Sequence, residues 1–150
     1  MATTDCGPLA ARTAVNAPYL DGLAAGVLRL QFCAACAAYQ FYPRPLCMAC
    51  GAPAPDWADA SGRGRLYAVS WLAMAPSAPF KPLVPYGIGL VDLEEGPRMM
   101  AHIRPDDSPA MGDPVIFESA VLIDGAAPVP VFGACSSARR PAAAGGVDHA

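Results

Sequence analysis

The chain has 150 residues, enough for one domain with or without a small appendage, and enough to bury a core without cross-links. Its formal charge is −3 and its ten basic residues are scattered, so the basic patch that nucleic-acid binding requires is missing. Hydrophobic residues make up 54% of the chain and charged residues 15%, whereas ordinary soluble domains carry about 25% charged residues. This composition predicts an apolar interface with another subunit, and a monomer with an alanine-rich surface is the alternative.

Targeting signals are not expected. The N-terminal residues lack the basic start and apolar segment of an export signal. The longest uncharged run, residues 66–80, contains two prolines and is too short to cross a bilayer. We therefore expect a cytoplasmic protein with no membrane partner, in a reducing compartment where disulfides are disfavoured.

The first predicted element is a short docking helix within residues 16–28, which follows a loose leader at residues 1–15. Asn16 is placed to cap it, Pro18 falls in its first turn, and Gly26 is placed to end it. Because such a short helix is not stable alone, its apolar stripe must pack on something. The expected docking residues are Tyr19, Leu20 and Leu23.

A predicted strand at residues 28–32 leads into four cysteines, which stand in two C-x-x-C steps separated by ten residues. Each step aims two sulfurs at one point, and four thiolates in a tetrahedron suit Zn²⁺. Strand-like residues on both sides of the first step predict a hairpin with the metal at its tip. Gly51 gives the second step a permissive backbone, whereas Ala37 occupies the same place after the first. The expected ligands are Cys33, Cys36, Cys47 and Cys50.

The expected metal site is closed, because cysteine fills all four positions, and we therefore expect one structural zinc ion rather than a catalytic one. The alternatives are a rubredoxin-type iron centre, a redox dithiol pair and idle thiols. Cys6 and Cys135 belong to no such pattern, and Cys135 is expected to be a small buried hydrophobe.

The rest of the chain is expected to form a β-barrel over residues 60–135. Before it, residues 29–59 comprise the zinc ribbon and a linker that begins at Gly51. Five predicted strands suit a small barrel of the OB type better than a sandwich, which needs about seven. Residues 75–85 hold four prolines and must be a loop, and residues 136–150 are expected to be a disordered tail. The predicted strands are residues 64–74, 86–93, 98–104, 114–123 and 129–134.

Short motifs occur in a distinctive order: QFYPRPLC at 40–47, SGRG at 61–64, PY at 85–86, EGPR at 95–98 and MGDPV at 111–115. With the helix and the cysteine spacing, this order over residues 17–123 resembles the DUF35 family of zinc-ribbon/OB-fold proteins. The resemblance implies a mainly β fold, in which a rubredoxin-like ribbon packs on a five-stranded OB barrel and the N-terminal helix docks on a partner. It also implies a hetero-oligomer with a thiolase-like subunit (a thiolase, an acyltransferase or a side-chain aldolase) that channels an acyl-CoA thioester.

Catalytic chemistry is not expected from the chain itself. His102 is alone in a predicted strand, His149 lies in the tail, and Asp106-Asp107 is most simply a solvated turn. The nucleophile and proton-transfer groups of thiolase-like chemistry would then come from the partner. Two alternatives stay open, a single-stranded nucleic-acid binder and a free-standing acyl-CoA thioesterase. The stacking platforms for a nucleic acid are Tyr67, Trp71 and Tyr86.

Binding of acyl-CoA by this chain has four candidate residues. CoA carries phosphates, which arginine and lysine recognise in different ways, and an acyl chain, which an aromatic side chain can line. Solvated surface charges and a plug in the barrel mouth are the simpler interpretations of the same residues. The candidates are Arg44, Arg63, Phe80 and Lys81.

Overall fold

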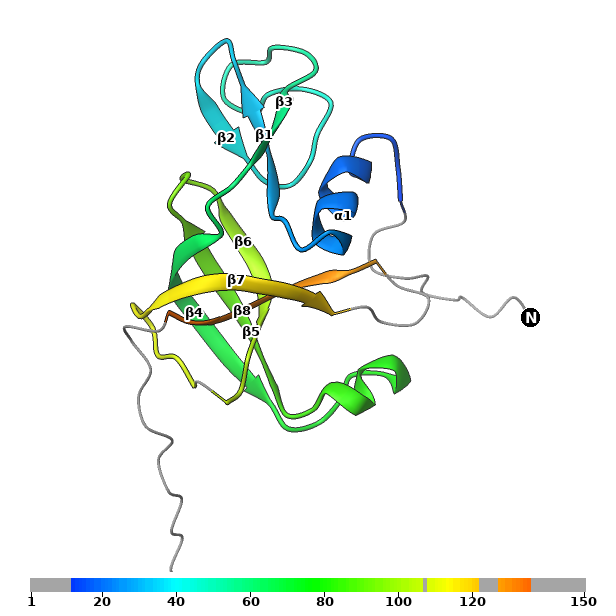
Figure 1. The fold of residues 1–150 in the computed structure, drawn as a ribbon, viewed down its shortest axis with the longest axis vertical. Helices are drawn as coiled ribbons and strands as arrows, with labels where there is room; N and C mark the ends of the chain where they lie inside the picture. Colours follow the sequence, from blue (N-terminus) through cyan, green and yellow to red (C-terminus); the bar gives the residue numbers. More distant parts are fainter. Residues whose placement is uncertain (1–11, 107, 122–126, 136–150) are drawn as a thin grey trace, which may run out of the picture.

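The structure, a computed structural model, describes residues 12–106, 108–121 and 127–135 (Figure 1). The elements in chain order are α1 (Ala17–Ala24), β1 (Arg29–Cys33), β2 (Ala38–Gln40), β3 (Asp56–Asp59), β4 (Arg63–Leu72), the 3₁₀ helix η1 (Ala78–Leu83), β5 (Tyr86–Leu93), β6 (Arg98–Ile103), β7 (Pro114–Val121) and β8 (Val129–Ala134). Several expectations concern residues outside the described ranges: most of the leader, the tail, Cys6, Asp107 and His149.

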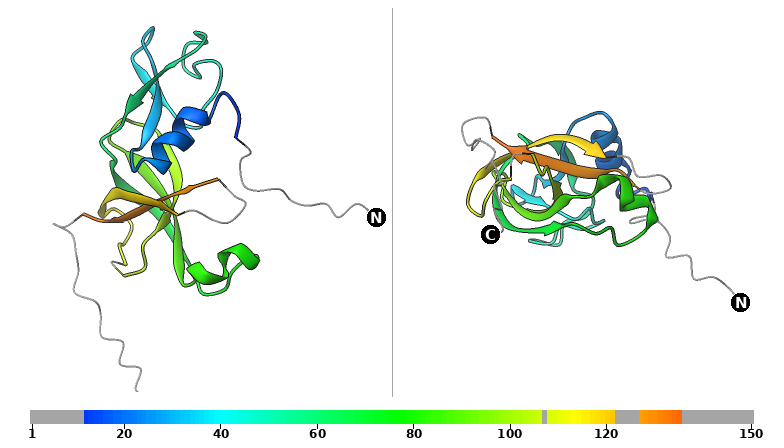
Figure 2. Two further views of the ribbon diagram at one scale, coloured as in Figure 1. Left: turned by 45° about the vertical axis from the view of Figure 1, so that its right-hand side comes forward. Right: turned by 90° about the horizontal axis from the view of Figure 1, so that it is seen from below.

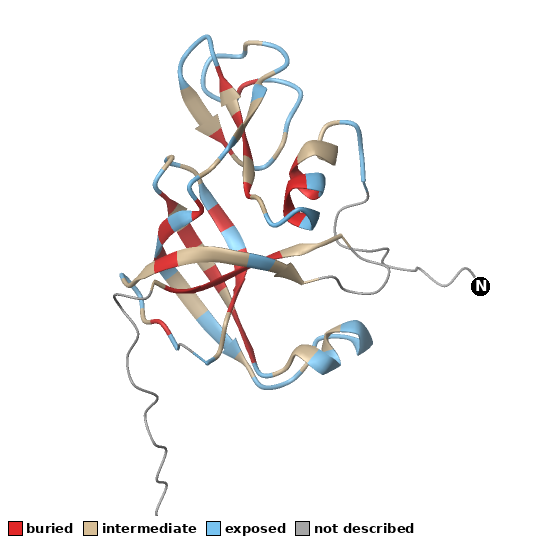
Figure 3. Cartoon of the chain, viewed as in Figure 1, coloured by how far each residue is buried: buried red, intermediate tan, exposed pale blue. Residues whose placement is uncertain are grey.

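The barrel confirms the predicted fold class, a mainly β chain with an N-terminal helix, a ribbon and a five-stranded OB-type barrel. Its strands follow the order β4-β5-β6-β8-β7, and β7 closes the barrel by pairing with β4. All the pairings are antiparallel except that of β6 with β8. Alternate residues point inward, as in the row of Leu66, Val91 and Met99 across β4, β5 and β6, and these form the buried interior (Figure 3).

The three-stranded sheet is the ribbon, with β1 between β2 and β3. The β1–β2 hairpin predicted around the first C-x-x-C step is present, with Gln31 opposite Gln40. The prediction of a linker up to residue 59 is wrong for Asp56–Asp59, which form β3 and pair with the other edge of β1. Aspartates and preceding prolines disfavour a strand locally, but the free edge of β1 offers backbone groups that need partners.

Helix α1 packs its apolar stripe inside the chain. Tyr19, Leu20 and Leu23 are 8%, 6% and 2% exposed. They belong to one hydrophobic core that also contains Leu30 of β1 and the interior of the barrel. Figure 1 shows α1 beside β1, where the ribbon meets the barrel. The side chains expected to dock on a partner are thus used by the chain's own core, because an eight-residue helix needs that packing to form.

The ends of α1 differ in part from the prediction. Asn16 precedes the helix, but its side-chain oxygen accepts a hydrogen bond from the Thr13 N–H at 2.7 Å instead of capping the first helical turn. Pro18 lies in the first turn as predicted, and Gly26 adopts a φ of +74° just after the helix. The described residues contain no helix that is both long and apolar enough to cross a membrane.

Residues 75–85, the predicted proline-rich loop, contain the short 3₁₀ helix η1 and are hereafter called the proline arm. None of the η1 residues is buried. Figure 1 and the left view of Figure 2 both show η1 at the end of the barrel away from the ribbon. The exposed side chains of the proline arm are therefore accessible to a molecule that binds at that end of the barrel.

Candidate metal centre

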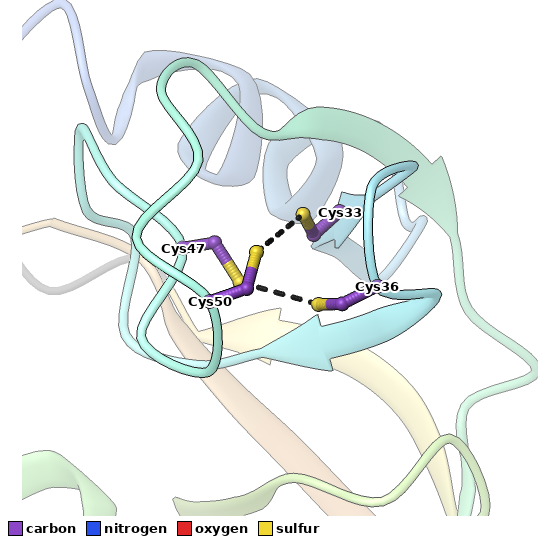
Figure 4. A group of neighbouring side chains, drawn as sticks. All are labelled: Cys33, Cys36, Cys47 and Cys50. Atoms are coloured by element: carbon purple, nitrogen blue, oxygen red, sulfur yellow. Dashed lines mark hydrogen bonds between the residues drawn. The ribbon is translucent and has the colours of Figure 1, made fainter.

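Four cysteine sulfurs converge between the two loops of the ribbon (Figure 4). All four Sγ atoms lie within 4.8 Å of one another. The separations are 3.7 Å between Cys33 and Cys50 and 3.6 Å between Cys36 and Cys47. A tetrahedral Zn²⁺ with bonds of about 2.3 Å would hold its sulfurs about 3.8 Å apart, while a disulfide needs about 2.05 Å. The donor set and its spacing therefore fit a tetrahedral metal ion, and the four cysteines are positioned to bind one.

The electrostatics of the four thiols also favour a cation. The N–H groups of Cys50 and Ala49 point at the Cys47 sulfur and lower the pKa of its thiol to about 6. At Cys36 the Ala38 N–H favours the thiolate, but the neighbouring sulfurs, that of Cys50 foremost, oppose it and the pKa is raised to about 12. Four adjacent thiolates repel one another, so a bound cation is needed before all of them ionise.

The two cysteine loops end in the same type of backbone conformation. Each ends in a residue with left-handed backbone, Ala37 at φ +56° and Gly51 at φ +78°. In the second loop the Gly51 N–H donates to the Cys47 carbonyl at 2.9 Å, which closes the turn. Glycine adopts this conformation freely, whereas an alanine does so at a cost.

Ala37→Gly is expected to stabilise the ribbon by about 0.5–1 kcal/mol, since the relief of left-handed strain exceeds the extra freedom that glycine gains on unfolding. Gly51→Ala is the matched change and should lower stability by about 1 kcal/mol, because no atom lies within 4 Å of the added Cβ and only backbone strain is introduced. Denaturant unfolding of both variants measures these effects. A less stable Ala37→Gly protein would contradict the assignment of strain.

Two buried glutamines of the ribbon contact the second cysteine loop, and sequence reasoning missed them. Gln31 is 4% exposed and Gln40 is 8% exposed. Both bond to the segment that carries Cys47. The signal was available in principle, because these are the only glutamines of the chain and they fall at facing positions of the predicted hairpin.

The four residues expected to bind acyl-CoA lie in different parts of the molecule. Arg44 is exposed in the ribbon, beside the metal centre. Arg63 is exposed at the start of β4, whereas the proline arm, which carries Phe80 and Lys81, follows the end of the same strand. The length of β4 separates them, so no single site unites all four; only Phe80 and Lys81 are neighbours.

Phe80 anchors the proline arm to the barrel through an aromatic cluster. Its ring centroid lies 6.3 Å from those of Tyr86 and His102, which stack on each other at 4.5 Å. Burial raises the pKa of Tyr86 and lowers the pKa of His102, which disfavours the charged form of each side chain. The Tyr86 hydroxyl is buried and has no hydrogen-bond partner among the residues that the structure describes. His102 is thus a packed strand residue.

The three platforms considered for nucleic acid differ in exposure, and Tyr67 is 53% exposed. Tyr86 is 4% exposed, and the Arg98 guanidinium lies 3.4 Å above the ring of Tyr67. Trp71 remains 44% exposed.

Cys135 is only partly buried, less than expected, because it follows the last strand of the barrel.

A closed four-cysteine ribbon joined to an OB barrel defines the class, a zinc-ribbon/OB-fold protein. Family models agree: the rubredoxin-like zinc ribbon domain of ChsH2 matches residues 20–56, and the C-terminal OB-fold domain of ChsH2 matches residues 57–117. The chain belongs to the DUF35 family, as its motifs predicted, and within that family it is ChsH2-like.

Solved structures and a curated relative show the same likeness. The structure named "Ltp2-ChsH2(DUF35) aldolase" contains a chain that is 29% identical, with a TM-score of 0.70 over 84% of this chain and 98% of that one. A DUF35 protein of unknown function from Sulfolobus solfataricus shares the fold, at 9% identity and a TM-score of 0.58 over 81% and 86% of the two chains. A Thermomonospora curvata protein named "Probable enoyl-CoA hydratase alpha subunit" is 32% identical over 106 residues, 69% of this chain. This chain spans about a third of the length of that relative, 32%.

Proposed function

We propose that this chain is a non-catalytic accessory subunit of a thiolase-like enzyme, with which it forms a hetero-oligomer that binds or channels an acyl-CoA substrate. The observation that carries the proposal is the likeness to the ChsH2 chain of an aldolase whose name joins it to a second component, Ltp2, because the likeness extends over 98% of that chain. The enoyl-CoA hydratase name of the curated relative supports acyl-CoA as the substrate class.

The metal of the proposed subunit is one structural Zn²⁺, bound by Cys33, Cys36, Cys47 and Cys50. When bound, Zn²⁺ supplies cross-linking and charge neutralisation, and with four protein ligands it keeps no open position for substrate. These thiolates require reducing conditions, which supports a cytoplasmic location.

Several features support an accessory rather than a catalytic role. Within the described part of the chain, His102 is the one histidine, and it is packed against Tyr86. The proposed zinc ion has a structural role, because four protein ligands leave it no open position. Large apolar side chains lie on the surface, as an interface with another subunit would require. The most exposed of them are Met48, Met74 and Met111, at 66%, 84% and 70%. If α1 also contacts the partner, it does so through exposed residues such as Asp21 and Ala24.

Co-expression with a candidate thiolase-like subunit from the same genome tests the role. We expect a stable complex on gel filtration and acyl-CoA turnover only when the thiolase-like subunit is present. A chain that stays monomeric beside that subunit, or that processes acyl-CoA unaided, would overturn the proposal.

Lys81→Ala is expected to weaken acyl-CoA binding by about 1.4- to 5-fold, because one exposed ion pair with a phosphate contributes about 0.2–1 kcal/mol. The loss should shrink as salt is raised, since the pair is exposed. Calorimetric titration of acetyl-CoA into the complex measures both effects. Arg29→Ala is the matched control, because Arg29 is paired with Asp59 at 3.0 Å on the ribbon. Equal affinities for Lys81→Ala and wild type would remove Lys81 from the proposed site.

A further inference from the structure

The two glutamines of the chain are joined across the ribbon. Gln31 on β1 and Gln40 on β2 are register partners, and the Gln40 Nε2 donates to the Gln31 Oε1 at 2.7 Å. Both side chains are buried, so each remaining polar atom needs a partner. Those partners come from one segment of backbone, residues 44–48, which includes Cys47.

The glutamines hold residues 44–48 on both sides of the cysteine. Gln31 exchanges two hydrogen bonds with the residue that begins the segment, and Gln40 bonds to the residues immediately before and after Cys47. The four bonds are Arg44 N–H to Gln31 Oε1 (2.7 Å), Gln31 Nε2 to the Arg44 carbonyl (2.9 Å), Met48 N–H to Gln40 Oε1 (2.8 Å) and Gln40 Nε2 to the Leu46 carbonyl (3.2 Å).

We propose that Gln31 and Gln40 are positioning residues for the metal centre, which fix residues 44–48 against the β1–β2 hairpin and so set Cys47 opposite Cys36. Their Sγ atoms are 3.6 Å apart. Groups outside the ligand sphere that orient metal ligands commonly raise metal affinity by about 10–100-fold. The inference rests on the proposed zinc function and adds the residues that tune its affinity.

Simple packing does not account for these side chains. Two apolar residues of similar length would fill the same space and continue the ribbon core. They would leave four backbone groups of residues 44–48 without the hydrogen bonds that tie this segment to the hairpin. Both members of the pair are amides, each of which supplies a donor and an acceptor at once.

The test replaces each amide by a thioether of similar length, in Gln31→Met and Gln40→Met. Affinities for Zn²⁺ and Co²⁺ are measured by competition with a chelator. We expect the Kd of each variant to rise about 10–100-fold. At saturation the Co²⁺ absorption bands should keep the positions of tetrahedral thiolate coordination, because the four ligands are unchanged.

Two controls separate positioning from general stability. Arg29→Met lies on the same strand and breaks only the exposed ion pair with Asp59, so its Kd should equal that of wild type. Val115→Ala removes buried methyl groups from the barrel, where Val115 is 1% exposed, and lowers stability without touching the ribbon. Its Kd should also stay unchanged.

Each outcome of the metal-binding measurements supports or contradicts a stated role. Gln variants that bind Co²⁺ within two-fold of wild type would overturn the positioning role, as would an equal rise in Kd for Val115→Ala. If a Gln variant folds only when metal is supplied during refolding, its rate of metal release to a chelator replaces the Kd, and a wild-type rate would overturn the role. A wild-type chain that binds neither metal would instead refute the proposed zinc function.

Discussion

Cys47→Ser is expected to remove the metal and unfold the ribbon. Structural Zn²⁺ contributes about 10–16 kcal/mol of binding free energy in zinc-finger peptides near pH 7, which is comparable with the whole stability of a domain. Cys47 is 4% exposed, and its sulfur accepts hydrogen bonds from two backbone N–H groups that favour the thiolate. A serine hydroxyl in its place would lose the bond to the metal and would not ionise to take the place of the thiolate. Elemental analysis and thermal unfolding measure the two losses.

The two tryptophans make the result specific to the ribbon. Trp57 lies on β3 and Trp71 on β4, so a Trp71→Phe background leaves Trp57 as a fluorescent reporter of the ribbon. Cys135→Ser is the matched control, because Cys135 follows the barrel and does not belong to the cysteine cluster. Metal content and Trp57 emission that survive in Cys47→Ser would show that the four cysteines do not form a metal site.

Leu23→Ala is expected to lower the free energy of unfolding of the isolated chain by about 2–5 kcal/mol. Leu23 is 2% exposed and belongs to the core shared by α1, β1 and the barrel, so the truncation leaves a cavity at the junction of the ribbon and the barrel. Urea unfolding followed by circular dichroism provides the measurement.

The same variant distinguishes internal packing from docking on a partner. Ala24→Gln changes an exposed position of the same helix to a residue with good helix propensity, and its stability should match that of wild type. A Leu23→Ala chain as stable as wild type when alone, yet weak in binding its partner, would return this residue to the docking role that its sequence position suggests.

Local patterns explain what could be predicted from the sequence. Two C-x-x-C steps are a local feature with few interpretations, and they placed four sulfurs within 4.8 Å of one another. The limits of β5 and β8 match the prediction, because each strand begins directly after a proline, Pro85 or Pro128, and turn residues mark strand ends. The order of motifs added the family, which the models of ChsH2 domains confirm.

The features that sequence reasoning missed depend on distant contacts. Residues 56–59 become a strand because β1 has a free edge to pair with, and nothing within the segment DWAD indicates this. The stripe of α1 predicts burial but not the surface that covers it, and here that surface is the chain's own core. The pairing of Gln31 with Gln40 follows only once the hairpin register is known.

Native mass spectrometry of this chain co-expressed with a candidate thiolase-like subunit tests the central claim most directly. The account predicts a hetero-oligomer in which every copy of this chain carries one zinc ion, released together with ribbon structure when a chelator is added. A metal-free chain detected as a monomer, separate from the thiolase-like protein, would contradict it.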